Sequence, residues 1–107
     1  MKMRSALLLS LCLATAAQAA ESPAELWMQK CKSCHGPDGK AQTRMGEKHS
    51  IADMSQPEWQ QKRTDDQIRE VISEGSSRDK KMKPYKDKLT PEQIDSLVHY
   101  IRTFKKG

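Results

Sequence analysis

The stretch that decides the fold is Cys31-Lys32-Ser33-Cys34-His35. Two residues between the cysteines place both sulfurs on one side of a single helical turn, where they reach the two vinyl groups of one porphyrin. The histidine that follows directly projects its imidazole toward the iron at the centre of the ring. C-x-x-C-H is the pattern by which a c-type haem is attached to a polypeptide. We therefore expect one covalent haem c, held by thioether bonds from Cys31 and Cys34 and ligated axially by His35.

Two other chemistries use closely spaced cysteines and remain as alternatives. A redox-active dithiol of the thioredoxin type also carries C-x-x-C, but at a strand-to-helix junction, and no run of this chain alternates with the period of two that predicts a strand. A zinc site needs about four ligands, and the sequence has no second cysteine pair to complete the set. A disulfide between Cys31 and Cys34 would close so small a loop that it would restrain little chain entropy.

The opposite face of the haem needs a second axial ligand, and Met82 is the best candidate. It lies 47 residues after His35 (82 minus 35), in a loop long enough to cross to that face. Pro84 stiffens this loop, and Tyr85 offers a ring to pack beside the porphyrin. Methionine ligation raises the reduction potential relative to bis-histidine ligation, which suits an electron carrier.

Other residues that offer a ligating atom are less suitable. Met28 lies three residues before the first cysteine and cannot easily reach the far face of the haem. His99 falls on the polar side of the last predicted helix, where we expect it to be solvated. Met54 stands between polar neighbours and is expected to fill a gap in the core. Met45 and His49 lie in the loop shortly after the motif, and the lysines complete the set of candidates.

The N-terminus has the pattern of an export signal over residues 1–19. A basic start precedes an apolar run over residues 6–17, and Ala17-Gln18-Ala19 fits the small-x-small cleavage pattern. The run is shorter than the ~20 apolar residues that span a bilayer. We expect cleavage after Ala19 or Ala20 and a domain over residues 20–107 in the periplasm.

Two rival interpretations of the N-terminus are a retained membrane anchor and a lipoprotein signal. The second would use Cys12, but Leu11 before it is bulky where a small residue is expected. We therefore assign Cys12 to the discarded signal. No other apolar stretch of membrane length follows, so the mature protein is expected to be soluble.

The composition indicates a small hydrophobic core and a protein with only a mild positive charge. The 107 residues carry 19 basic and 14 acidic side chains, and loss of Lys2 and Arg4 with the signal leaves 17 against 14, a net charge of about +3. This mild excess, without a basic-aromatic stripe, gives no reason to expect nucleic acid as a partner. Only 36% of residues are hydrophobic and 5% aromatic, and so small a chain often depends on a prosthetic group for stability.

Four segments carry helix signals. Ser22 and Glu25 form a capping-box pattern around Pro23, and the helix that follows delivers the cysteines. A short helix is expected within residues 51–62, and loops are expected over residues 36–48 and 76–89.

The last two predicted helices have clearer amphipathic patterns. Thr64 and Gln67 cap the first of them, which ends at Gly75; its expected buried face is Ile68, Val71 and Ile72. Thr90, Pro91 and Gln93 begin the second. Its apolar stripe consists of Ile94, Leu97, Val98, Ile101 and Phe104.

From Ala24 to Lys105 the chain resembles the class I c-type cytochromes, in the group of small bacterial single-haem proteins. The motif followed by Gly36, the aromatic Trp27 four residues before Cys31, and Leu97-Val98-His99-Tyr100-Ile101 carry the resemblance. It implies an all-α cytochrome c fold of about four helices around one haem with an exposed edge. In that fold Tyr100 would pack near Trp27 where the terminal helices cross.

One departure from the family pattern lies at the proposed ligand. The family often has Met-Pro-x-Phe/Tyr, whereas Lys83 intervenes here to give Met82-Lys83-Pro84-Tyr85. The difference concerns the geometry of the loop and leaves the ligand chemistry unchanged.

These observations together predict an electron carrier rather than an enzyme, passing single electrons between redox proteins. One hypothesis is that lysines around the ligand loop steer docking onto an acidic partner surface; the alternative is that they merely form a solvated loop face. They are Lys80, Lys81, Lys83, Lys86 and Lys88. Two other functions stay open: a haem c subunit docked to a larger oxidoreductase, and a haem-based sensor or enzyme with an open sixth position.

Overall fold

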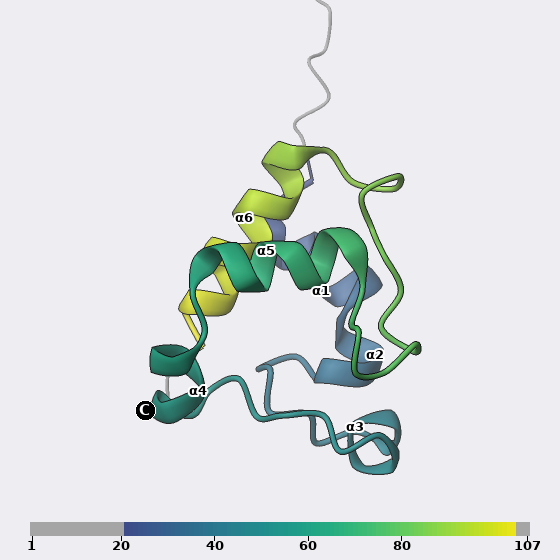
Figure 1. Cartoon of the computed structure of the whole chain (residues 1–107), viewed down its shortest axis with the longest axis vertical. Coiled ribbons are helices and arrows are strands. Elements are labelled where there is room, and N and C mark those ends of the chain that lie inside the picture. Colours follow the sequence, from purple (N-terminus) through teal and green to yellow (C-terminus); the bar gives the residue numbers. More distant parts are fainter. Residues whose placement is uncertain (1–20, 105–107) are drawn as a thin grey trace, which may run out of the picture.

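Six α-helices and no strand make up residues 21–104, the part of the chain that the computed structural model describes (Figure 1). In chain order they are α1 (Pro23–Lys30), α2 (Lys32–His35), α3 (Arg44–Lys48), α4 (Pro57–Lys62), α5 (Asp65–Glu74) and α6 (Pro91–Arg102). The all-α prediction is confirmed, whereas the export signal expected over residues 1–19 lies outside the described residues. None of the helices in this part is long and apolar enough to cross a bilayer.

The core lies where α1 packs against α6. Leu26 and Trp27 of α1 are 1% exposed, and they meet an α6 face that includes Leu97 and Val98. The ring centroids of Trp27 and Tyr100 are 6.0 Å apart, which confirms the predicted contact between the terminal helices. The residues that bury this face recur at spacings of three and four, as a helix requires to present one apolar stripe.

Helix α5 lies across α6 and closes the core from a second side (Figure 1). Its Ile68 and Ile72 are buried, one helical turn apart. Val71 was expected on the same face, but it is 38% exposed, so that part of the prediction is wrong. The physical reason is that a ten-residue helix crossing one neighbour buries only a narrow i, i+4 stripe, and Val71 falls beside it.

Capping residues set the helix ends largely as the sequence predicts. Thr64 and Thr90 each form a full capping box, with Gln67 and Gln93 respectively. At α1 only one half is formed: the backbone N–H of Glu25 donates to the Ser22 hydroxyl over 3.2 Å. The expected short helix within residues 51–62 is α4.

Two short helices, α2 and α3, were not among the four that the sequence predicts. Helix α2 is the turn of the cysteine motif itself, and α3 lies in the segment 36–48 that was expected to be a loop. Thr43 explains α3, because its hydroxyl accepts a hydrogen bond from the backbone N–H of Gly46 over 2.8 Å. An amphipathic pattern is missing from Arg-Met-Gly-Glu-Lys, so a cap rather than apolar burial makes this turn helical.

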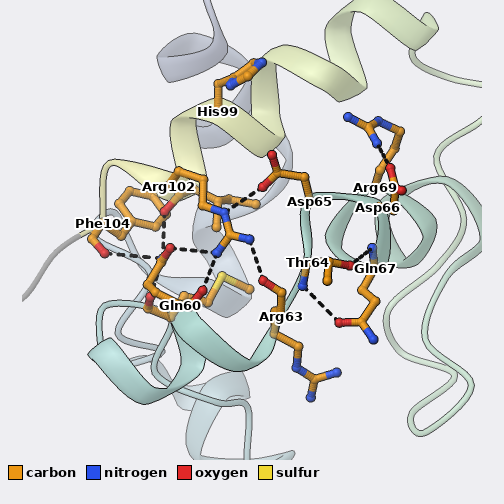
Figure 2. A network of polar contacts seen from close by, with 12 residues as sticks. Gln60, Arg63, Thr64, Asp65, Asp66, Gln67, Arg69, His99, Arg102 and Phe104 are labelled. Carbon is orange, nitrogen blue, oxygen red and sulfur yellow. Dashed lines mark hydrogen bonds and ion pairs between the residues drawn. The ribbon is translucent and has the colours of Figure 1, made fainter.

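A polar network joins α4 to the end of α6 (Figure 2). The guanidinium of Arg102 donates to the carbonyl oxygen of Gln60 over 2.8 Å, to the carbonyl of Arg63, and to Asp65 over 2.8 Å. The side-chain amide of Gln60 donates in return to the carbonyl oxygen of Ile101 over 3.0 Å. Helix α4 buries none of its residues fully, so these contacts are a main part of what holds it against the core.

Candidate haem site

The cysteine motif occupies the tight turn that follows α1. Cys31 caps the C-terminus of α1, and its carbonyl oxygen accepts hydrogen bonds from the N–H groups of Cys34 (3.3 Å) and His35 (3.0 Å). Gly36 ends the turn with a φ of 78°, and its N–H donates to Lys32. A left-handed backbone of this kind favours glycine. The local sequence therefore folds both thiols and the imidazole into about one helical turn.

Both thiols are free and partly buried. Burial raises the pKa of the Cys31 thiol to about 11, against a smaller lowering by Lys30. The Cys31 thiol is therefore neutral at physiological pH, unlike the low-pKa thiolate on which a redox-active dithiol depends. The turn also follows a helix, whereas the dithiol alternative required a strand before the motif.

His35 has the properties of an axial ligand. Burial lowers the pKa of its imidazole, which keeps the ring neutral and leaves a nitrogen lone pair available. The Nδ1 atom is buried and has no hydrogen-bond partner, and no side-chain hydrogen bond within residues 21–104 occupies Nε2. Two free thiols and a neutral, unengaged imidazole at fixed offsets fit a covalently bound haem c.

Two side chains hold this turn in place through hydrogen bonds that the sequence did not predict. The indole N–H of Trp27 donates to the carbonyl oxygen of Gly36 over 2.8 Å in a buried contact, and its ring centroid is 5.7 Å from that of His35. The hydroxyl of Thr43 donates to the carbonyl oxygen of Cys34 over 2.6 Å. Trp27 was expected only to pack near Tyr100, and nothing in the sequence marked Thr43 as a contact of the motif.

Met82 lies half-buried in the long segment between α5 and α6, which Figure 1 shows descending from the end of α5 to the level of α2 before it rises to α6. Gly75, with a φ of 82°, begins this segment; an added Cβ there would lie 2.8 Å from the carbonyl oxygen of Met82. The hydroxyl of Tyr85 donates to the carbonyl oxygen of Lys30 over 3.2 Å. The segment is thus anchored beside the cysteine motif, through Tyr85 rather than through Met82 itself.

Three of the remaining candidates are placed as the sequence predicts, whereas Met45 lies in α3 and not in the expected loop. Met28 is 45% exposed on α1, and the side chain of His99 is 73% exposed on α6. Met54 packs against the hydrophobic core. His49 follows α3, and only 16% of its side chain is exposed. Groups of three or more His, Cys, Asp or Glu side chains that would hold a metal ion do not occur in the described part.

Comparison with known proteins agrees with this geometry. The family model described as "Cytochrome C oxidase, cbb3-type, subunit III", a c-type cytochrome domain, matches residues 18–101. Among solved structures, the KustC0563 c-type cytochrome is 42% identical, with a TM-score of 0.73, and the match covers 80% of this chain and all of that one. A mutant of the same cytochrome matches at 41% identity and a TM-score of 0.70, over 79% of this chain and all of the mutant chain. No curated protein sequence matches significantly.

The fold, the motif and these matches agree on one assignment, including its covalent haem c. The chain belongs to the family of small c-type cytochromes.

Proposed function

We propose that the protein is a periplasmic carrier of single electrons, whose haem c is bound by Cys31 and Cys34 and ligated by His35 and Met82. The observation that carries the proposal is the turn after α1, where two free thiols and a neutral imidazole meet in a c-type cytochrome fold. When bound, haem supplies reversible one-electron exchange at its iron.

The residues of the chain set the conditions for that exchange. The ring of Trp27 lies beside that of His35, with 5.7 Å between the ring centroids, and Nδ1 of the His35 imidazole is buried. A methionine from the segment between α5 and α6 would fill the sixth position, which suppresses the binding of external ligands. Filled axial positions and an exposed edge suit electron transfer between proteins rather than catalysis on a substrate.

Surface charge supports a protein partner of acidic character. The five lysines of the segment are all exposed, but they are not equivalent. The ammonium of Lys86 pairs with Glu74 over 3.0 Å, and that of Lys88 lies 5.6 Å from the centre of the Tyr85 ring. We therefore assign steering mainly to the other three, which are Lys80, Lys81 and Lys83.

The docking role is tested by charge reversal. Lys81→Glu is expected to slow electron transfer to the partner several-fold at low salt, and added salt is expected to reduce the difference. Lys62→Glu, on α4 at another side of the molecule, is the matched control and is expected to have a smaller effect (Figure 1). Equal effects of the two variants, or rates independent of ionic strength, would contradict steering by the ligand segment.

Ligation is tested by spectroscopy on protein matured in a cell that installs haem c. We expect a covalent mass increase of one haem, a reducible low-spin spectrum, and the far-red band that marks methionine ligation of ferric haem. Met82→Ala is expected to abolish that band, whereas Met28→Ala, a change on the exposed side of α1, is expected to retain it. A high-spin wild-type protein, unaffected by Met82→Ala, would instead favour the sensor or enzyme alternative.

Export is tested separately. The mature protein is expected in the periplasmic fraction, with an N-terminus at Ala20 or Glu21. A membrane-bound protein whose N-terminus is still Met1 would instead favour a retained membrane anchor.

A second candidate function is that of a subunit docked to a larger oxidoreductase. It is favoured by the description of the matching family model, which names an oxidase subunit. Purification from the native host at physiological salt distinguishes the two functions. A free carrier elutes alone at its own small size, and a subunit elutes with its large partners.

A further inference from the structure

The segment that carries Met82 is folded into a compact hydrogen-bonded unit. The backbone N–H of Ser76 donates to the carbonyl oxygen of Met82 over 3.1 Å, and the N–H of Met82 donates to the carbonyl oxygen of Asp79 over 3.2 Å. The N–H of Asp79 donates to the Ser76 hydroxyl over 3.3 Å, and the Asp79 carboxylate accepts from the N–H of Lys81 over 2.9 Å. Residues 76–82 therefore form one hydrogen-bonded unit, with Asp79 at its centre.

This unit is fastened to the segment that follows α3 by two side-chain contacts. His49 Nδ1 lies 3.2 Å from Asp79 Oδ2, and the guanidinium of Arg78 donates to the carbonyl oxygen of Ser50 over 3.2 Å. The side chain of His49 is 16% exposed and that of Asp79 is 36% exposed, so the first contact is the more protected one. Contacts shielded from water are stronger than exposed ones of the same geometry.

The far end of this connection is the cysteine motif. Thr43 donates to the carbonyl oxygen of Cys34 and caps the N-terminus of α3. His49 lies at the other end of that helix, where its backbone N–H donates to the carbonyl oxygen of Met45. His49 Nε2 is buried without a partner, so the contact with Asp79 is the polar interaction through which the described structure holds this imidazole. A non-covalent path thus runs from the motif through α3 to the methionine segment.

We propose that His49 is a positioning residue, which holds the Met82 segment against the motif through Asp79 and so sets how firmly the sixth ligand stays in place. The proposal rests on the assignment of Met82 as that ligand. Loss of the His49 contact would raise the population of protein in which the segment has swung away. External ligands bind only that open population, so their apparent affinity measures it.

The probe is imidazole, titrated into the ferric holoprotein. His49→Leu removes the hydrogen-bonding nitrogen and keeps an apolar side chain of similar width, and it is expected to tighten imidazole binding about three- to tenfold, as the loss of one ordinary hydrogen bond implies. The far-red methionine band is expected to weaken in parallel. His49→Asn retains an N–H donor at the same distance from the backbone as Nδ1 and is expected to restore most of the wild-type behaviour.

His99→Leu is the matched control, because His99 also lies near a carboxylate, 3.8 Å from Asp95, but on the exposed side of α6. It is expected to leave imidazole affinity unchanged. A wild-type protein without the methionine band would overturn the Met82 assignment and this inference with it. A normal band, combined with equal imidazole affinities in the wild type and a folded His49→Leu variant, would overturn the positioning role alone.

Discussion

Trp27→Phe is the substitution whose cost the structure defines best. The indole is 1% exposed, and its N–H donates to the carbonyl oxygen of Gly36, the residue directly after His35. Phenylalanine keeps an aromatic ring but offers no donor. The same carbonyl oxygen also accepts from the backbone N–H of Gly39 over 3.4 Å, so the variant removes the shorter of its two hydrogen bonds and leaves a gap where the larger ring was.

The magnitude follows from these two losses. The loss of one hydrogen bond costs about 0.5–1.5 kcal/mol, and the atoms missing from the smaller ring cost about 1–2 kcal/mol in lost burial and residual cavity. We expect the free energy of unfolding to fall by about 2–3 kcal/mol, a large share of the ~5–15 kcal/mol of a typical domain. The edge contact with Phe104, whose ring centroid lies 4.9 Å away, is expected to loosen as well.

The assay is guanidinium denaturation of the holoprotein, followed both by the Soret absorbance and by far-ultraviolet circular dichroism. Trp59→Phe is the matched control, because Trp59 is only partly buried and its indole donates no hydrogen bond within residues 21–104. We expect it to cost about 1 kcal/mol. Losses in the two variants that agree within about 0.5 kcal/mol would refute the role given to the Trp27 hydrogen bond.

Three further substitutions test other parts of the structure. Tyr85→Phe removes the hydrogen bond to the carbonyl oxygen of Lys30 and is expected to lower the free energy of unfolding by about 1 kcal/mol, measured by chemical denaturation. An unchanged free energy of unfolding would contradict a stabilising role for this contact. Gly46→Ala places a methyl group against the backbone carbonyl of Ala41 and is expected to destabilise the protein by about 1–3 kcal/mol, measured by thermal unfolding; a neutral result would show that α3 shifts freely. Burial alone would raise the pKa of Asp53, but hydrogen bonds from Gln56 and Ser55 outweigh burial and lower that pKa. The ionised carboxylate therefore stabilises the fold at pH values above the ordinary carboxyl pKa. This stabilisation is lost as the pH falls through the lowered pKa. Asp53→Asn is therefore expected to be less stable than the wild type near neutral pH, with a difference that narrows below about pH 4; a constant difference across that range would contradict it.

Much of the fold was predictable because it depends on residues that are close together in the sequence. Thr64 and Thr90 begin helices through the capping boxes that their sequences predict, and the apolar stripe of α6 is buried as its periodicity requires. The chemistry of the motif follows from three residue types at fixed offsets, and the family matches bear out its haem c.

What the sequence did not predict depends on how distant segments approach each other. The exposure of Val71 follows from the narrow crossing of α5 over α6, and α3 exists because Thr43 caps a turn with no apolar pattern. The contact of His49 with Asp79 joins residues thirty positions apart (79 minus 49). Periodicity and spacing describe one segment at a time and contain no information on such contacts.

The network around Arg102 has a consequence for the order in which the protein assembles. Its guanidinium reaches carbonyl groups 42 and 39 residues earlier in the chain, at Gln60 and Arg63. During synthesis α4 therefore cannot form these hydrogen bonds until α6 has been made and folded. Truncation before Arg102 would remove these hydrogen bonds and loosen α4 from the core even if every residue of α4 and α5 were intact. Proteases are then expected to cut first at α4.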